Sequence, residues 1–559
     1  MKEINTKDIK IAYFSMEIAL ENWIKSYSGG LGVLAGDTLK SAADLQIPML
    51  GVSILNKNGF FKQVINRAGE QVEKKDSFNY KKFKKIKKRV KIKIANDWVT
   101  VQAWQYCLAS RDKGQLPIFF LDCDLKENKL KYRQLNLNLY GSDPKYRLMQ
   151  EIILGRAGVK ILSAMGYTGI NKYHLNEGHA ALAAIELFLN SKAKSQTKKI
   201  EEVQKKCLFT THTPIKAGHD TFPISLAKEL QKDFPFKLPG LIKDAELNMT
   251  EIALYFSNYV NGVAFSHQAV SARMFPNHYI RAVTNGVHSS TWTSPEFQRL
   301  YDKYIPTWRI DSLSLRNAFN ISTKEIWLAH QGAKQRLINY IYKKQKIKLD
   351  LNTFTIGFAR RFTGYKRSTL LFHNMDELIR ISKSAGPIQI IYAGKAHPED
   401  PDGKAMIKEI NRLKNVYSQK IKIIFLENYD LNIAKLMVAG VDVWLNTPLP
   451  PNEASGTSGM KAAHNGVPHF STLDGWWVEG FVNRKTGWSI GERRSTLDPK
   501  ELNPKDAKNL YDKLENRILP RYYKQANNWR ETMRYTIAIN ASFFNSQRMI
   551  QQYIQSAYL

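Results

Sequence analysis

The residues of this sequence best suited to chemistry are cations that follow a strand-like segment. Four of them stand within eight residues, directly after the apolar run TFTIGFA: Arg360, Arg361, Lys366 and Arg367. A guanidinium offers a planar fork of N–H donors and an ammonium offers a compact charge, so the two together suit a phosphate. A solvated loop in a lysine-rich chain is the alternative interpretation. The position at the carboxyl end of a strand favours an anion site.

Two further segments place small residues before a helix. Residues 28–32 (SGGLG) precede the helical pattern VLAGDTLKSAADL, where glycines let backbone N–H groups approach an anion. Phosphate contact and simple turn chemistry explain this segment equally well. Residues 452–461 (NEASGTSGMK) lead into a short helix that we expect to end near Asn465-Gly466. Lys461 would lie one turn inside that helix, and a lysine amine can form a Schiff base with pyridoxal phosphate.

These segments resemble the α-glucan phosphorylases (glycogen, starch and maltodextrin phosphorylase), in particular their shorter bacterial and archaeal type. The likeness runs from about Ile11 to Gly491. Other matching stretches are AYFSMEIAL, LNKNGFFKQ, LYGSDPKYRLMQEIILG, HLNEGHAALAAIEL, FTTHTPIKAGHDTF, VTNGVHSSTW, YAGKAHPEDPDGK, LENYDLNIAKLMVAGVDVWLN and STLDGWWVEG. The segment containing Lys461 is the most specific, because glycogen synthases and other two-domain glycosyltransferases lack it.

The resemblance implies pyridoxal 5'-phosphate as the cofactor, carried on Lys461. Thr457, Ser458 and Arg360 would hold the cofactor phosphate. Tyr429, in the ENYD stretch, would pack beside the cofactor.

The resemblance also implies two substrates, inorganic phosphate and an α-1,4-glucan. Its catalytic residues would be Lys461, Arg361, Lys366 and His212. Arg361 and Lys366 would bind the attacking phosphate together with the backbone of the turn at Gly29, Gly30 and Gly32. His212 would hydrogen-bond the glucosyl unit and sense charge near the scissile bond. The sugar pocket would be lined by Asn285, Tyr365, Glu453, Ser455 and Gly456.

The expected reaction is phosphorolysis with retention, which yields α-D-glucose 1-phosphate. Glycosidases protonate the leaving oxygen with one of two carboxyl groups, and no such acidic pair stands out here. In the family that this chain resembles, the substrate phosphate donates the proton and the cofactor phosphate supports the transfer. Clustered cations would offset the repulsion between the two phosphates.

Strand-like runs alternate with helical patterns along the chain, which predicts the α/β class with largely parallel sheets. The resemblance implies two Rossmann-like domains facing a cleft, the B-type glycosyltransferase fold. We expect residues 1–288 to form an N-terminal glucan-binding domain. Residues 289–559 would form the domain that binds pyridoxal phosphate. The spacing leaves open whether the last helical stretch, 528–558, packs back on the N-terminal domain.

The composition is that of an ordinary globular protein. A hydrophobic content of 43% and a charged content of 24% exclude a disordered or fibrous chain. Cys107, Cys123 and Cys207 are too few for a disulfide framework or a zinc cluster, so we expect no metal site. The first residues lack the apolar core of a signal peptide, and no apolar run approaches the roughly 18 residues of a membrane helix. We therefore expect a cytoplasmic protein.

The net charge is strongly positive, at 83 − 50 = +33. Either a polyanionic partner or a lysine-rich surface without a partner would account for it. Residues 81–93 (KKFKKIKKRVKIK) hold nine basic residues and no acid, a pattern typical of an edge strand protected by lysines. No nucleic-acid-binding motif accompanies this run, so a nucleic-acid partner is not expected.

Two alternative functions remain open. A nucleotide-sugar glucosyltransferase of the same fold would have no need of Lys461. A non-catalytic glycan- or polyanion-binding relative would have no need of Arg361, Lys366, His212 and Lys461. Family members are often dimers, but no dimer face is evident, and the preferred glucan is undetermined. His464 replaces the apolar residue expected in the family, and it either lines the cofactor pocket or fills space.

Overall fold

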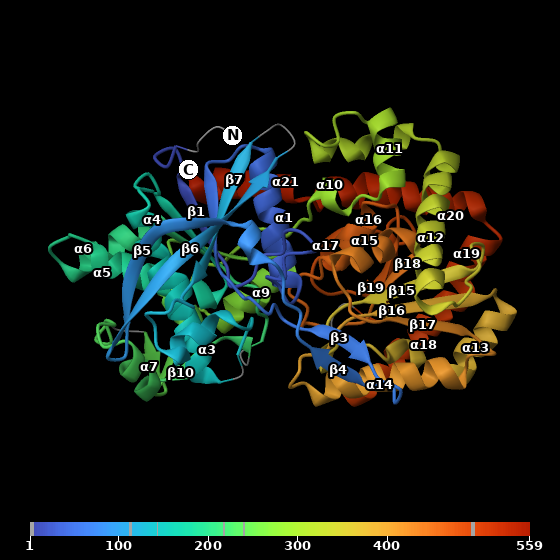
Figure 1. Cartoon of the computed structure of the whole chain (residues 1–559). Helices are drawn as coiled ribbons and strands as arrows, with labels where there is room; N and C mark the ends of the chain where they lie inside the picture. Colours follow the sequence, from blue (N-terminus) through green and yellow to red (C-terminus); the bar gives the residue numbers. More distant parts are fainter. Residues whose placement is uncertain (1–4, 111–113, 142, 216–217, 239–240, 493–497) are drawn as a thin grey trace. The chain divides into compact units, whose positions relative to one another are not determined.

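The computed structural model describes residues 5–110, 114–141, 143–215, 218–238, 241–492 and 498–559 (Figure 1). They form two compact units. The first comprises Met1–Phe61, Lys75–Val283 and Ile550–Leu559, and the second comprises Lys62–Lys74 and Thr284–Met549. The chain therefore passes from one unit to the other after Phe61, Lys74, Val283 and Met549. The division into functional domains at residue 288 stays a prediction.

A nine-stranded sheet forms the centre of the first unit. Its strands, in spatial order, are β14 (Arg281–Ala282), β13 (Tyr259–Gly262), β9 (Cys207–Thr210), β8 (Lys172–Asn176), β1 (Ile11–Phe14), β2 (Met49–Ile54), β7 (Gln115–Asp122), β6 (Asp97–Ala109) and β5 (Lys84–Ile94). The strands from β14 to β7 pair in parallel, and β7, β6 and β5 pair antiparallel. A smaller antiparallel sheet contains β10 (Thr221–Pro223), β12 (Glu246–Asn248) and β11 (Ile242–Lys243).

The central strands are apolar along their whole length because both faces of the sheet are covered. Every residue of β1 (IAYF) and β2 (MLGVSI) is buried, as expected of parallel strands between helical layers. The β5 strand lies at the sheet edge, with its lysines exposed and Ile92 and Ile94 buried. The prediction of a lysine-bearing edge strand is thus confirmed.

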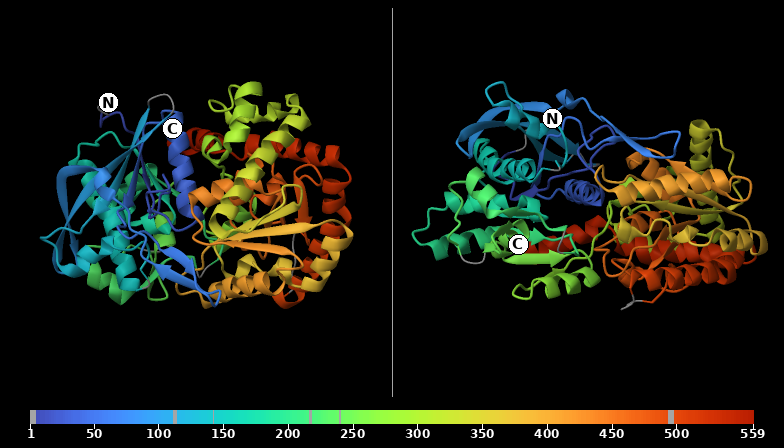
Figure 2. Two further views of the ribbon diagram at one scale, coloured as in Figure 1. Left: turned by 45° about the vertical axis from the view of Figure 1, so that its right-hand side comes forward. Right: turned by 90° about the horizontal axis from the view of Figure 1, so that it is seen from below.

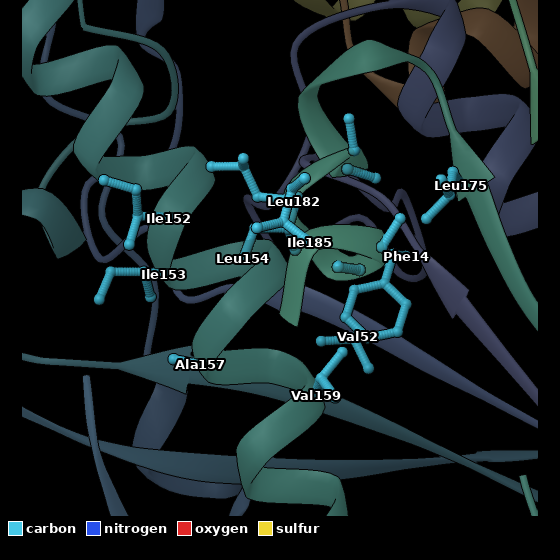
Figure 3. Packing of buried hydrophobic residues seen from close by; sticks show 14 of the residues in the cluster. Phe14, Val52, Ile152, Ile153, Leu154, Ala157, Val159, Leu175, Leu182 and Ile185 are labelled. Carbon is cyan, nitrogen blue, oxygen red and sulfur yellow. The ribbon is translucent and has the colours of Figure 1, made fainter. Parts of the chain in front are cut away.

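The first unit also contains helices. They include α1 (Gly30–Asp44), α2 (Leu130–Arg133), α3 (Pro144–Ile152), α4 (Gly158–Ala164), α5 (Leu182–Asn190), α6 (Gln196–Lys206), α7 (Ile224–Leu230), α8 (Met249–Tyr255) and α9 (Phe265–Met274). Figure 3 shows side chains of the helical segment between α3 and α4, and of α5, gathered over Phe14, Val52 and Leu175 of β1, β2 and β8. These side chains form part of one continuous apolar core.

Residues 550–559 complete the first unit. The Tyr558 hydroxyl lies 2.7 Å from His174 Nδ1 on β8. The Asn261 side-chain amide on β13 donates to the Tyr553 hydroxyl at 3.0 Å. All four side chains are buried, so this last segment satisfies polar groups inside the sheet.

The second unit is built on a six-stranded parallel sheet. Its order is β17 (Lys422–Leu426), β16 (Ile388–Ala393), β15 (Phe354–Ala359), β18 (Val443–Asn446), β19 (His469–Thr472) and β20 (Gly487–Ile490). Helices lie on both sides of this sheet (Figure 2). The antiparallel hairpin of β3 (Lys62–Ile65) and β4 (Gln71–Lys74) belongs to this unit, where the Gln63 side chain donates to the Gly394 carbonyl at 2.8 Å.

The helices of the second unit include one of 23 residues, α12. They are α10 (Ser289–Trp292), α11 (Pro295–Tyr304), α12 (Thr323–Gln345), α13 (Met375–Ser384), α14 (Pro401–Val416), α15 (Leu431–Gly440), α16 (Ser458–Ala463), α17 (Trp477–Gly480), α18 (Pro499–Lys513), α19 (Leu519–Tyr523) and α20 (Ala526–Tyr535), and α21 (Ser546–Tyr553) spans the change of unit at Met549. The α16 helix ends close to the predicted Asn465-Gly466, and Gly466 adopts a positive φ of 64°.

The expected α/β class with largely parallel sheets is confirmed in both units. Cys107, Cys123 and Cys207 are free thiols. Among the helices that the structure describes, none is both long and apolar enough to cross a membrane.

Candidate active site

A buried ion cluster lies at the carboxyl end of β15 in the second unit. Arg360 follows this strand directly, and its Nη2 donates to Glu453 Oε2 at 2.5 Å. Lys366 Nζ donates to the same oxygen at 2.6 Å. Both cations thus bind Oε2, and Glu453 Oε1 has no partner among the described residues. One oxygen anchors the carboxylate, and the other remains able to accept a hydrogen bond from a ligand.

The pKa values of Lys366 and Glu453 in this cluster are strongly shifted. Burial and the neighbouring Arg360 charge lower the pKa of Lys366 to about 7, although Glu453 opposes the shift. Burial disfavours the charge of Glu453, but Arg360 and Lys366 outweigh burial and hold the pKa of that carboxyl at about 2. Lys366 therefore gains and loses its proton near neutral pH while Glu453 stays ionised.

Asp474 supports the loop that carries Glu453. The Glu453 backbone N–H donates to Asp474 Oδ2 at 2.8 Å, and the Gly475 N–H donates to Oδ1 at 2.9 Å. Burial, with the negative charge of Glu453, raises the pKa of Asp474 to about 7. Within the same loop Gly456 adopts a φ of +81°, a conformation that favours glycine.

Lys461 lies on α16 and is buried. Its Nζ is 4.2 Å from the centroid of the Trp292 ring on α10. Thr457 and Ser458 begin the same helix, and the Ser458 hydroxyl accepts a hydrogen bond from Trp444 Nε1 at 3.0 Å. Trp292 and Trp444 thus limit the space around Lys461 and Ser458, respectively.

Arg360 carries unsatisfied hydrogen-bond donors. Its Nε and Nη1 atoms are buried and have no hydrogen-bond partner within the described part of the chain. Buried guanidinium nitrogens without an acceptor are costly, so an anionic ligand fits here. Burial raises the pKa of Tyr429 and the Arg360 charge opposes this shift, which indicates that the phenol lies within electrostatic reach of Arg360. These residues fit the phosphate of a cofactor.

The remaining expected residues of this unit differ in their surroundings. Arg361 is exposed and has no ion pair within the described ranges. Lys366 Nζ lies 4.4 Å from the centroid of the Tyr365 ring. Ser455 Oγ and Asn285 Oδ1 are buried without a described hydrogen-bond partner, as polar groups of a ligand pocket are before the ligand binds.

The glycine-rich turn of the first unit already holds a carboxylate. The Ser28 and Gly29 N–H groups donate to Glu17 Oε2 at 2.6 and 3.1 Å. A Cβ on Gly32 would come within 2.8 Å of the same oxygen, so only glycine lets the helix start this close to Glu17. The phosphate contact expected of this turn would fall to the N–H groups from Gly30 onward, at the N-terminus of α1.

His212 of the first unit is held by Asn176, the last residue of β8, and by Glu177, which follows it. Its backbone N–H donates to Glu177 Oε2 at 2.8 Å, and its Nε2 lies 2.7 Å from Asn176 Oδ1. Glu177 adopts a φ of +79° and a ψ of 164°, a region that is strained for any residue with a side chain. Such strain persists where the surroundings fix it, and here the Glu177 carboxylate also accepts from Thr213 Oγ1 at 2.9 Å.

The carbohydrate phosphorylase family model matches residues 16–118 and 239–487. The chain belongs to the carbohydrate phosphorylase family. It is 36% identical to maltodextrin phosphorylase of Thermococcus litoralis, over 98% of this chain and 70% of that protein. It is 36% identical to glycogen phosphorylase of Aquifex aeolicus, over 98% of this chain and 86% of that protein. Glycogen phosphorylase of Mycobacterium tuberculosis is 32% identical, over 98% of this chain and 70% of its own length.

The expected site residues of this carbohydrate phosphorylase fall in both units. The first unit holds His212, Gly29, Gly30 and Gly32. The second unit holds Lys461, Arg360, Arg361, Lys366, Thr457, Ser458, Tyr429, Asn285, Tyr365, Glu453, Ser455 and Gly456. The structure brings Arg360, Lys366 and Glu453 into direct contact, and Arg361 is not in hydrogen-bond contact with them.

Sequence reasoning missed the residues that hold the expected site residues of each unit in place. Asp474, Glu17, Asn176 and Glu177 stand inside the stretches that carry the family resemblance, but each was read only as part of a motif. Asn176 and Glu177 could have been found from the sequence, because polar residues at the carboxyl end of a buried parallel strand are typical of a ligand site. His464 is buried and lies 3.0 Å from Ser289 Oγ and 2.8 Å from the Met460 carbonyl, in a packed, hydrogen-bonded position.

Proposed function

We propose that this carbohydrate phosphorylase is an α-1,4-glucan phosphorylase, which transfers the non-reducing terminal glucosyl unit of an α-1,4-glucan to inorganic phosphate. The product is α-D-glucose 1-phosphate with retained configuration. The observation that carries the proposal concerns Arg360. Its buried Nε and Nη1 atoms have no acceptor among the described residues, and its Nη2 shares the Glu453 carboxylate with Lys366. The names of the relatives, maltodextrin phosphorylase and glycogen phosphorylase, support it.

Pyridoxal 5'-phosphate is the cofactor that these residues fit. Lys461 would carry it, while Arg360, Thr457 and Ser458 would hold its phosphate and Tyr429 would pack beside it. When bound, this cofactor supplies a phosphate group that can exchange a proton with the substrate phosphate.

The residues of the chain divide the remaining work. Lys366 and Arg361 would bind inorganic phosphate. Because the pKa of Lys366 is low, a bound phosphate dianion would favour the protonated, charged form of its amine. Glu453 Oε1 would accept a hydrogen bond from a sugar hydroxyl, since Oε2 already accepts hydrogen bonds from Arg360 and Lys366. Ser455, Asn285 and the backbone at Gly456 would complete the sugar contacts, with Tyr365 alongside.

In the first unit, the family resemblance assigns substrate contacts to His212 and to the turn before α1. Burial, with the nearby His267, His174 and His179, lowers the pKa of His212 well below its ordinary value. The imidazole is therefore neutral and suited to a hydrogen bond with a sugar hydroxyl. The N–H groups from Gly30 onward would bind phosphate. Free Cys107, Cys123 and Cys207 favour the reducing cytoplasm as the compartment.

The test is glucose 1-phosphate release from maltoheptaose with and without inorganic phosphate, in cofactor-supplemented protein. We expect phosphate-dependent release in the wild type and its loss in Lys461→Ala. Lys513→Ala is the matched control, because this half-buried lysine donates only to Ser489 within the described residues. Absence of release from the wild type would overturn the proposal, and glucosyl transfer from a nucleotide sugar instead would establish the transferase alternative.

A further inference from the structure

The contacts of His212 extend into a directional chain of hydrogen bonds inside the first unit. His212 Nε2 lies 2.7 Å from Asn176 Oδ1, and Asn176 Nδ2 donates to Ser15 Oγ at 3.1 Å. Ser15 Oγ in turn donates to the backbone carbonyl of Glu17 at 2.8 Å. Ser15 and Asn176 are buried, at 0% and 1% exposure, so water does not compete for these bonds.

The Glu17 carbonyl sets the direction of this chain. A carbonyl only accepts, so the one proton of the Ser15 hydroxyl must point to it. Ser15 Oγ can then only accept from Asn176, which places the amide NH2 group on the Ser15 side. The amide oxygen of Asn176 consequently faces His212.

The direction of the amide decides which nitrogen of His212 carries the proton. An amide oxygen is an acceptor, so a proton on Nε2 completes the 2.7 Å contact. His212 is neutral because burial lowers its pKa, and a neutral imidazole has one proton. Nδ1 is therefore an acceptor, and it has no partner within the described residues.

We infer that Asn176 and Ser15 are positioning residues that lock His212 in the Nε2–H tautomer, which leaves Nδ1 as the atom that accepts the sugar hydroxyl already assigned to His212 by the proposed function. This inference rests on the proposed function for the identity of the ligand, while the tautomer itself rests on the hydrogen-bond chain alone. The locked ring selects a ligand group that donates. It also excludes Nδ1 as a proton donor to the leaving oxygen.

The tautomer can be measured directly on the full chain. In protein labelled with ¹⁵N-histidine, the ring nitrogens of His212 give separate signals for protonated and unprotonated nitrogen, and their loss in His212→Gln assigns them among the 12 histidines. We expect protonated Nε2 and unprotonated Nδ1 in the wild type. A wild-type ring with the proton on Nδ1 would overturn the inference, whatever the variants do.

Ser15→Ala and Ser53→Ala form a matched pair. Both serines are 0% exposed, and Ser53 Oγ donates to the Met16 carbonyl at 3.1 Å, next to the carbonyl that Ser15 uses, without touching Asn176. We expect Ser15→Ala to let Asn176 turn over, to populate the Nδ1–H tautomer, and to lower kcat/KM for maltoheptaose about tenfold, which corresponds to about 1.4 kcal/mol. Ser53→Ala should keep the wild-type tautomer.

The two levels of the inference fail separately. Equal tautomer populations in both serine variants would remove the role assigned to Ser15. A wild type without phosphorolysis would contradict the proposed function, but the ¹⁵N signals would still report the locked ring. If the locked ring is present and Ser15→Ala changes the tautomer without lowering kcat/KM more than Ser53→Ala does, the sugar contact at Nδ1 is wrong.

Discussion

Asp474 accepts the backbone N–H of Glu453 through Oδ2 at 2.8 Å, so two buried carboxyl groups meet at one loop. Their pKa values move apart, to about 2 for Glu453 and about 7 for Asp474. Arg360 and Lys366 bind Glu453 directly, whereas Asp474 has backbone N–H donors and the repulsion of Glu453. One carboxylate thus stays charged at neutral pH, while its neighbour changes charge there.

Asp474→Asn tests this pair through the pH dependence of stability. The pKa of Asp474 rises from 3.8 to about 7 on folding, so its stabilising effect is complete below pH 3.8 and is lost as the pH rises through 7. The asparagine variant cannot lose it. We expect the Tm of the variant minus the Tm of the wild type to increase by about 2 °C or more between pH 4 and pH 8. A Tm difference that is constant with pH would contradict the raised pKa.

Lys366→Arg tests the charge that we assign to phosphate binding. Because the pKa of Lys366 is lowered to about 7, the charged fraction falls about tenfold between pH 6 and pH 8. We expect the KM for phosphate of the wild type to rise over this range by up to about tenfold more than that of the arginine variant, which stays charged. The variant also serves as the control for the ionisation of phosphate itself. Identical pH profiles would show that Lys366 does not titrate near neutrality.

Arg156 offers a stability test in the first unit that is independent of function. It donates through Nε to Glu186 at 2.9 Å and through Nη1 and Nη2 to Asp233 at 2.8 and 2.6 Å, while Arg156 and Glu186 are buried. Arg156→Met should cost about 3–5 kcal/mol, because the buried Glu186 would keep only the Lys160 ammonium at 3.5 Å and the Asn190 amide at 3.1 Å among the described residues. Denaturant unfolding measures this loss.

Lys145→Met provides the contrast to Arg156→Met. Lys145 and Glu229 lie 2.6 Å apart with side chains 44% and 52% exposed. Solvent screens this pair, so its removal should cost at most about 1 kcal/mol. Equal losses in the two variants would mean that burial does not control the strength of these ion pairs.

The sequence was sufficient for the class of fold and for the position of the cations, because both follow from local patterns. The apolar run of β15 and the Arg360–Arg361 pair after it are contiguous in the chain. The pairing of Arg360 with Glu453 spans 93 positions, and it depends on which loops meet at the edge of a folded sheet. No local pattern encodes such a meeting.

The turn at Gly29 shows the same limit at shorter range. Glycines before a helix predicted either a phosphate contact or simple turn chemistry, and the phosphate contact stays a prediction; the anion that the Ser28 and Gly29 N–H groups contact is Glu17 of the same chain. Likewise the TTHT motif pointed to His212, while its tautomer depends on Ser15 and Asn176, which come from two other strand ends. Donor and acceptor directions become readable only once these side chains are placed together.

The contribution of residues 550–559 to the first unit has a consequence for biosynthesis. A ribosome that has translated through Val283 has produced all other residues of this unit, yet His174 and Asn261 still lack the Tyr558 and Tyr553 hydroxyls. Every residue of the second unit is translated before those tyrosines emerge. The nascent first unit is therefore incomplete during this interval, and His174 Nδ1 lacks the buried hydrogen-bond partner that it has in the folded chain.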